Sequence, residues 1–287
     1  MLERILVGTD GSDSAAQAVA RAAQLVASTG AELLVLSAYT RRDGPAAAEA
    51  VLEEVIAEHK PKRSRALVRE GPPADVILDA AEDEAVDLIV VGNRGMTGAR
   101  RFVLGSVPNT ISHNAPCSVL IVKTTEGLVL THTRRVEPTA PYHAIVVGTD
   151  GSATSLTSVR TAASLAKAEN SRLIIVSAYL PLDQKAIEHW QAEAGEEFAW
   201  RFTTSAHAEE AIDKARAVAA EQGCEPETRI ERGEAALVLT QVADNERADL
   251  VVVGNRGMTG KTRFLLGNVP NKVSHHPPCD VMIVKTT

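Results

Sequence analysis

Short stretches of four to seven residues, each with an apolar run of three or four, recur along the first part of the chain, and each ends close to glycine, proline or polar residues. Runs of this length and composition are typical of buried β-strands. The pattern predicts strands at residues 4–7, 32–38, 65–69, 87–91 and 118–123.

Longer stretches with helical spacing separate these strands. After the first strand, Ser12 or Ser14 can cap a helix that continues through alanine-rich sequence to Ser28, and Gly30 ends it. Further helices are predicted at 46–59, at 73–84 and from Gly105 onward. Alternating strands and helices predict βαβ units, right-handed crossovers and a parallel sheet, so the fold class is α/β.

The same pattern occurs twice. Residues 5–12 (Ile-Leu-Val-Gly-Thr-Asp-Gly-Ser) return at 145–152 with one conservative change, and residues 91–98 (Val-Gly-Asn-Arg-Gly-Met-Thr-Gly) return unchanged at 253–260. The second copy is longer between these blocks, where residues 184–222 read as a longer helix or a helix pair. The repeat predicts a first domain at 1–125, a linker at 126–141 and a second domain at 142–287.

Composition agrees with two α/β domains. The chain has 287 residues, enough for two domains of about 140 residues each. Hydrophobic residues make up 45% of it and aromatic residues only 3%. The cores must therefore consist of Val, Ile, Leu and Ala, which favours α/β over a β-sandwich.

Charge and cysteine usage exclude several classes of protein. A net charge of −7 without a basic stripe argues against nucleic acid as a partner. The apolar runs are too short to cross a membrane and no signal peptide is apparent, so we expect a cytoplasmic protein. Cys117, Cys224 and Cys279 show no CxxC spacing, which argues against a zinc site or a disulfide framework.

A glycine-rich loop follows the fourth predicted strand of each copy. Its spacing is Gly92-x2-Gly95-x9-Gly105-Ser106, and a helix starts directly after it. Glycine allows a positive φ and a close approach of the backbone to a ligand, while a helix start supplies amide groups and a positive dipole end for anions. The loop lacks the Gly-Lys-Ser/Thr of Walker A, and a G-x-G-x-x-G dinucleotide motif would follow the first strand. A tight turn without a ligand remains the alternative.

The predicted topology brings two loops together. In open α/β sheets the ligand crevice lies outside the carboxyl ends of the strands, where the strand order reverses. We therefore expect the loop after the first strand, with Asp10, to meet the loop after the fourth strand, with Gly92.

Three motifs together resemble the universal stress protein superfamily, in its ATP-binding branch and tandem-domain form. They are the Val-Gly-Thr-Asp-Gly-Ser start, the G-x2-G-x9-G-(S/T) loop and the closing Ala-Pro-Cys-Ser-Val-Leu-Ile-Val. The resemblance covers both halves except the linker and the variable helix. It implies two Rossmann-like domains of the adenine nucleotide alpha hydrolase type, each a five-stranded parallel sheet of order 3-2-1-4-5 with helices on both faces, and one ATP per domain.

The resemblance also implies where ATP would bind. In the first domain the matching positions are Gly8, Thr9, Asp10, Ala38, Val91, Gly92, Arg94, Gly95, Gly105, Ser106 and Val107. In the second domain they are Gly148, Thr149, Asp150, Ala178, Val253, Gly254, Arg256, Gly257, Gly267, Asn268 and Val269.

Each part of this set has an implied role. Asp10 and Asp150 would lie near adenine or ribose, or contact the Mg²⁺ of Mg-ATP through water. Ala38 and Ala178 would offer backbone groups to adenine, and the glycine-rich loops would wrap the ribose and phosphates. The arginine inside each loop could neutralise phosphate charge, or could be a solvated surface residue.

The second copy departs from the family pattern at one position. Asn268 stands where the family places Ser or Thr. An amide can still donate a hydrogen bond to phosphate and cap a helix, so we expect binding in the second copy, with an affinity that the sequence leaves open.

The sequence predicts a regulator rather than an enzyme, because a phosphate-binding lysine, a carboxylate pair for Mg²⁺ and a base are not convincingly placed. His113, His275 and His276 read as residues near helix C-termini. The resemblance implies an ATP-dependent regulator of stress response or growth arrest, with slow ATP hydrolysis at most. The alternatives are cyclic AMP in place of ATP, a weak ATPase or other enzyme of a related fold, and a scaffold that binds nothing.

The resemblance further implies how the protein assembles. Family members dimerise through the last strand, so residues 118–123 and 280–285 are predicted to pair between the two halves. A homodimer of the whole chain and a regulatory protein partner are also expected.

Overall fold

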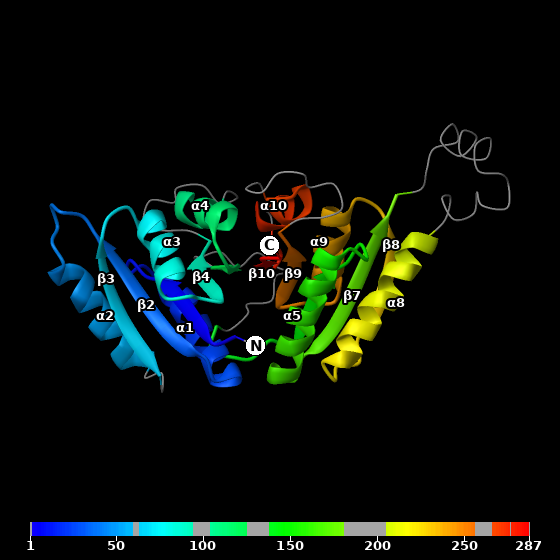
Figure 1. Cartoon of the computed structure of the whole chain (residues 1–287), viewed down its shortest axis with the longest axis horizontal. Helices are drawn as coiled ribbons and strands as arrows, with labels where there is room; N and C mark the ends of the chain where they lie inside the picture. The colour runs from blue at the N-terminus through cyan, green and yellow to red at the C-terminus, as the bar shows by residue number, and fades with distance from the viewer. Residues whose placement is uncertain are drawn as a thin grey trace.

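The computed structural model describes residues 2–59, 63–93, 104–124, 138–180, 205–255, 266–275 and 277–286. These residues form one ten-stranded sheet with helices on both faces, seen edge-on in Figure 1. Within the described residues, no helix combines the length and the apolar character needed to cross a membrane.

Strands and helices alternate in the first half as predicted. The elements are β1 (Arg4–Gly8), α1 (Asp13–Thr29), β2 (Glu32–Tyr39), α2 (Ala46–His59), β3 (Ser64–Glu70), α3 (Pro73–Asp83), β4 (Leu88–Gly92), α4 (Ser106–Asn114) and β5 (Ser118–Val122). Ser12 caps α1, because its side chain accepts a hydrogen bond from the Ala15 amide. Gly30 ends α1 in the left-handed conformation, with φ of 76°.

The second half repeats this order. Its elements are β6 (Ala144–Gly148), α5 (Ala153–Glu169), β7 (Arg172–Tyr179), α8 (Ala206–Glu221), β8 (Glu227–Arg232), α9 (Ala235–Asn245), β9 (Leu250–Gly254), α10 (Asn268–His275) and β10 (Asp280–Val284). Of the longer helix or helix pair predicted at 184–222, the described part is α8. Residues 184–204 lie outside the described residues.

The strand order is β3-β2-β1-β4-β5-β10-β9-β6-β7-β8. Each half therefore has the order 3-2-1-4-5 that the family resemblance implied. The predicted pairing of the last strands is confirmed: β5 and β10 are antiparallel, and Leu120 lies opposite Met282. Because these two residues occupy matching positions in the two copies, an approximate two-fold axis passes between them.

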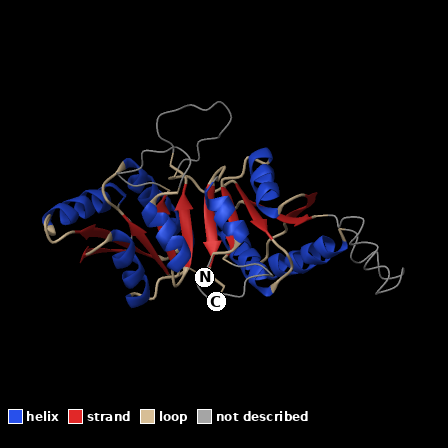
Figure 2. Cartoon of the chain, turned by 90° about the horizontal axis from the view of Figure 1, so that it is seen from above, coloured by secondary structure: helices blue, strands red, loops and turns tan. Residues whose placement is uncertain are grey.

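The two halves point in opposite directions along the sheet. All strands within one half are parallel, whereas β5 and β10 are antiparallel. Figure 2, which looks onto the sheet, shows strand arrows of opposite direction at its centre. The carboxyl ends of the strands of one half therefore lie at the opposite edge of the sheet from those of the other half.

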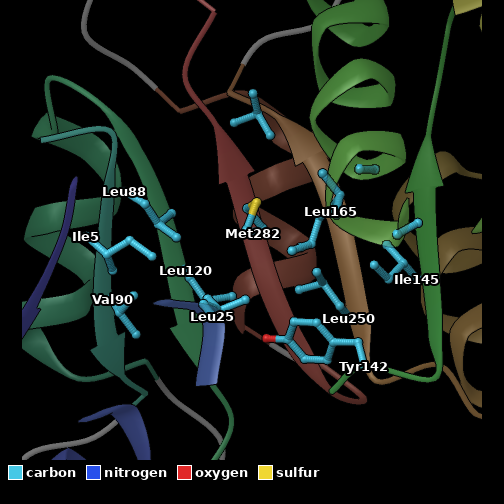
Figure 3. Packing of buried hydrophobic residues seen from close by; sticks show 14 of the residues in the cluster. Ile5, Leu25, Leu88, Val90, Leu120, Tyr142, Ile145, Leu165, Leu250 and Met282 are labelled. Carbon is cyan, nitrogen blue, oxygen red and sulfur yellow. The ribbon is translucent and has the colours of Figure 1, made fainter. Parts of the chain in front are cut away.

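Two apolar cores run across the junction between β5 and β10, which we call the seam. One core packs α1, α2, α5 and α8 against one face, and the other packs α3, α4, α9 and α10 against the other face. Leu25 and Leu120 from the first half share a core with Leu165 and Met282 from the second (Figure 3). Hydrophobic burial therefore holds the halves together as well as stabilising each one.

Candidate functional site

The loop after β1 (residues 9–12, the β1 loop) is a tight turn held by its own side chains. The Thr9 amide donates to the Leu36 carbonyl at 2.8 Å, and the Gly11 amide donates to Thr9 Oγ1 at 3.2 Å. Asp10 Oδ1 accepts from the amide and the hydroxyl of Ser12 at 3.0 and 2.5 Å. Gly11 has a φ of 75°, which disfavours any residue with a side chain. Asp10 thus shapes the turn, a role that the sequence analysis missed.

The loop after β6 (residues 149–152, the β6 loop) repeats this turn in the second half. The Thr149 amide donates to the Val176 carbonyl at 2.9 Å, and Asp150 Oδ1 accepts from the amide and the hydroxyl of Ser152 at 3.1 and 2.5 Å. Ser155, which replaces Ala15 of the first half, adds polar contacts: its Oγ accepts from the Asp150 amide at 3.3 Å and lies 3.1 Å from Thr149 Oγ1. The two turns therefore share a geometry but differ in the polar groups behind them.

Asn93 anchors the loop after β4 (residues 93–105, the β4 loop). Its amide donates to the Val122 carbonyl, and its own carbonyl accepts from the Gly105 amide, both at 3.0 Å. Its side-chain Oδ1 accepts from the Thr124 amide at 3.2 Å and from the Thr124 hydroxyl at 2.5 Å. Asn93 thus joins the two ends of the loop to the end of β5. Arg94 and Gly95, predicted as ligand contacts, lie outside the described residues.

Asn255 anchors the loop after β9 (residues 255–267, the β9 loop) in the same way. Its carbonyl accepts from the Gly267 amide at 2.9 Å, and Oδ1 accepts from the amide and hydroxyl of Thr286 at 3.2 and 2.6 Å. Arg256 and Gly257 lie outside the described residues. The sequence did not lead us to expect either of these asparagine–threonine contacts, Asn93 with Thr124 or Asn255 with Thr286. The available signal was the repetition of the asparagine and of a Lys-Thr-Thr after the last strand in both copies.

Gly92 is glycine for a packing reason. The sequence suggested either a positive φ or a close approach of the backbone as the reason for glycine here. Gly92 is not among the residues with positive φ, so the first reason is wrong for this position. A Cβ on Gly92 would lie 2.5 Å from Ser14 Oγ and 2.9 Å from the Ser14 carbonyl oxygen. The absence of a side chain therefore lets β4 approach the first turn of α1.

The start of α4 has two amide groups without an acceptor inside the helix. Gly105 is the N-cap residue, with φ of −60° and ψ of 161°, and among the described residues no side-chain hydrogen bond caps the helix. Ser106 is exposed and Val107 is half-buried, while Pro108 has no N–H. The amides of Ser106 and Val107 have no acceptor within the helix. In the second half, Asn268 is exposed at the start of α10, with half-buried Val269 and then Pro270.

The sheet register brings these groups to one edge. Val7 pairs with Val90, so Gly8 is level with Val91, and Gly8 also pairs with Leu36. Ala38 lies two residues beyond Leu36 at the end of β2. The β1 loop, the end of β2 and the β4 loop therefore meet where the strand order reverses, as predicted. The second half assembles Gly148, Thr149, Ala178, Val253 and Gly254 in the same way.

The described residues contain no group of three or more His, Cys, Asp or Glu side chains that could hold a metal ion. Asp10 and Asp150 accordingly belong to no such cluster. His113 and His275 lie in the last turns of α4 and α10, as predicted, and His276 is outside the described residues. The arrangement presents hydrogen-bond donors at the helix starts, which suit an anionic group, and one carboxylate in each first-strand loop (Asp10 and Asp150), which suits a hydroxyl or a hydrated cation.

The three cysteines are free, and burial suppresses the chemistry of their thiols. Burial raises the pKa of Cys117 to about 12, and it raises the pKa of Cys224 and of the buried Cys279 as well. At pH 8 roughly one Cys117 thiol in ten thousand is then ionised, and the thiolate is the reactive form.

We therefore expect slow alkylation of the native protein at pH 8. Cys224 should react first because it is the least buried of the three cysteines, while Cys117 and Cys279 should react only after unfolding. Mass spectrometry of iodoacetamide-treated protein measures the order, with urea-unfolded protein as the control. Equal rates for Cys117 in native and unfolded protein would contradict the expectation.

Comparison with known proteins gives matches to both halves. The model of the Universal stress protein family matches residues 1–123 and 141–285. A universal stress protein of Mycobacterium tuberculosis is 39% identical over 141 residues, which cover 42% of this chain and 96% of that protein.

Solved structures match as well. A putative universal stress protein from Pseudomonas aeruginosa covers 99% of this chain and 93% of its own, with 19% identity and a TM-score of 0.68, which shows a shared fold over both halves. A universal stress protein solved in complex with cAMP is 36% identical; the match covers 52% of this chain and all of that one, with a TM-score of 0.37.

Proposed function

Because the chain belongs to the universal stress protein family, we propose that each half binds one ATP where its first and fourth strands end, and that bound ATP regulates a stress response or growth arrest. The two sites of this proposal lie at opposite edges of the sheet. The role is that of a regulator, in which the nucleotide favours one arrangement of loops and helices over another.

The observation that carries the proposal is the start of α4 beside the β1 and β4 loops, where no side chain of the described residues caps the helix. The amides of Ser106 and Val107 and the Ser106 hydroxyl offer donors to phosphate oxygens, and the positive end of the helix dipole adds to them. In the second half, Asn268 supplies an amide side chain in place of the hydroxyl. A repeated anion site of this kind fits the phosphate tail of ATP.

Adenine and ribose would lie along the rest of the edge. Ala38 would offer its backbone groups to adenine, and the turn shaped by Asp10 would face the ribose. Mg²⁺ that accompanies ATP would be held chiefly by phosphates and water, with Asp10 or Asp150 contacting it through water.

The family resemblance also led us to expect a homodimer and a regulatory protein partner. Since β5 and β10 already pair within the chain, a second copy must bind through another surface. We propose both as assembly partners.

Substitution of Ser106 by proline tests the site in the first half. Proline is favoured at the first helical position, and the extended Gly105 backbone suits a residue before proline, so α4 should persist. The change removes one amide N–H and one hydroxyl. Loss of one hydrogen bond to a charged oxygen costs about 1.5 kcal/mol or more, so ATP affinity in this half should fall by about tenfold or more. Asn268→Pro removes the corresponding backbone N–H and the side-chain amide in the second half.

The measurement has two parts. Purified protein is heat-denatured and the released nucleotide is identified by mass, and nucleotide-free protein is titrated with ATP and with cAMP by calorimetry. Ser106→Ala removes only the hydroxyl and should weaken binding less than Ser106→Pro.

Ala235→Pro is the matched control, because Ala235 starts α9 and its counterpart in the first half is already Pro73. This control should bind ATP normally. Wild-type protein that binds no ATP, or full binding by the Ser106→Pro, Asn268→Pro double variant, would refute the proposal. Tighter binding of cAMP than of ATP would show that cAMP, and not ATP, is the ligand of these sites.

A further inference from the structure

Two lysines cross the seam and hold the backbone of the opposite half. Lys123 follows β5, and its Nζ donates to the Pro278 carbonyl of the second half at 2.7 Å. Lys285 follows β10, and its Nζ donates to the Ala115 carbonyl of the first half at 3.0 Å. Both lysines are partly buried. A partly buried ammonium group that donates to a carbonyl forms one of the stronger hydrogen bonds in proteins.

The backbones of the same two lysines are also held by the opposite half. The Lys123 amide donates to Asp280 Oδ1 at 2.9 Å, and the Lys285 amide donates to Ser118 Oγ at 3.2 Å. Each lysine is thus fixed at two points, and its position follows that of the partner half.

Each lysine stands next to the threonine that clamps a nucleotide loop. Thr124 follows Lys123 and holds Asn93 at the base of the β4 loop, and Thr286 follows Lys285 and holds Asn255 at the base of the β9 loop. One peptide bond therefore joins each lysine, which contacts the opposite half, to the threonine at the base of a proposed site.

Helix α4 completes a connection between the two edges of the sheet. It starts at the proposed phosphate site of the first half, and the Ala115 carbonyl lies at its C-terminal end. Lys285 grips this carbonyl beside the base of the second site. A nine-residue helix moves as one body, so a shift of its first turn toward phosphate also shifts the carbonyl that Lys285 holds.

We propose that the two nucleotide sites are positively coupled through these crossed lysine contacts, so that ATP bound in one half raises the affinity of the other half. The inference rests on the proposed ATP sites and adds a regulation to them. ATP held at the first turn of α4 fixes the Ala115 carbonyl and with it Lys285, and Thr286 next to Lys285 holds Asn255 at the base of the second site, so part of the cost of fixing that site is already met when the second ATP binds. We expect a coupling of about fivefold or more, the lower end of the usual range.

The test measures the affinity of the second site with the first site open or blocked. Ser106→Glu places a carboxylate at the first helical position, where it favours the helix and repels phosphate. The NMR amide signals of Gly105 and Gly267 report ATP binding at each site separately. Blocking the first site should weaken ATP binding at the second by about fivefold.

The same comparison is repeated in a Lys285→Met background. Methionine keeps an unbranched apolar chain but cannot donate a hydrogen bond, so the block should no longer change the affinity of the second site. Lys285→Arg should keep part of the coupling. Lys123→Met removes the other lysine contact across the seam and serves as an independent test if Lys285→Met folds poorly.

Three outcomes are distinct. A second-site affinity that is the same with the first site open or blocked would overturn the coupling while leaving the ATP sites intact. A coupling that persists in both methionine backgrounds would overturn the role of the lysines. Absence of ATP-induced changes at Gly105 and Gly267 in the wild type would instead reject the proposed function itself.

Discussion

Replacing Asp280 with alanine should lower the free energy of unfolding by about 3 to 5 kcal/mol, because the change leaves a buried arginine without its carboxylate. Arg21 is fully buried and Asp280 is 2% exposed. Arg21 Nε lies 3.4 Å from Asp280 Oδ2, and the guanidinium carbon lies 4.2 Å from the centre of the Tyr142 ring. The Tyr142 hydroxyl donates to the same carboxylate oxygen at 2.9 Å. One carboxylate thus supports two residues on opposite sides of the seam.

The chain itself supplies the control. Thr161 and Ser118 occupy the positions that match Arg21 and Asp280 in the other copy, so the seam carries this charge pair on one side of the two-fold axis only. The double variant Arg21→Thr, Asp280→Ser should lose less stability than Asp280→Ala alone, because the buried arginine that loses its carboxylate in Asp280→Ala is itself removed. Urea denaturation followed by circular dichroism measures both. A loss below about 1 kcal/mol for Asp280→Ala would show that Arg21 finds water or another partner.

Replacing Gly92 with alanine should cost about 3 kcal/mol of unfolding free energy, the upper end for an overpacked site. The new Cβ would lie 2.9 Å from the Ser14 carbonyl oxygen and 3.2 Å from the Ser14 carbonyl carbon. These atoms belong to the first turn of α1, which packs on β4 and cannot move without disturbing the core.

Gly8→Ala is the control for this prediction. The Cβ on Gly8 would meet Ile77 Cδ1 at 2.7 Å, the far end of a flexible side chain, so about 1 kcal/mol is expected. Thermal or urea unfolding compares the two variants, and an equal loss would contradict the packing argument. Loss of nucleotide in Gly92→Ala would then follow from a displaced loop, so Ser106→Pro is the cleaner probe of phosphate binding.

Much of the fold could be predicted from local sequence. The strands at 32–38 and 87–91 are apolar runs between turn residues, and α1 has a serine cap and a terminal glycine, so short-range pattern suffices for both. The strand order and the pairing of the last strands came from the family resemblance and are confirmed. The ATP contacts remain predictions, and four of them (Arg94, Gly95, Arg256 and Gly257) lie outside the described residues.

The candidate site at the end of the first and fourth strands was predicted only in outline. That the β1 and β4 loops meet follows from parallel topology, which the alternation of elements determines. Thr124 bonds to Asn93, and Gly92 lies against Ser14, although these residues are far apart in the sequence. No local sequence pattern therefore predicts these contacts.

The sequence by itself determined the duplication, the alternating elements and the loops that carry the proposed chemistry, because periodicity and turn residues act over a few positions. Only the tertiary structure decided that Arg21, Tyr142 and Asp280 share one buried site, that two cores run across the seam, and that each lysine reaches the opposite half. The physical reason is that a buried charge or a close backbone contact depends on which surfaces the folded sheet brings together. The spacing of residues along the chain does not contain that information.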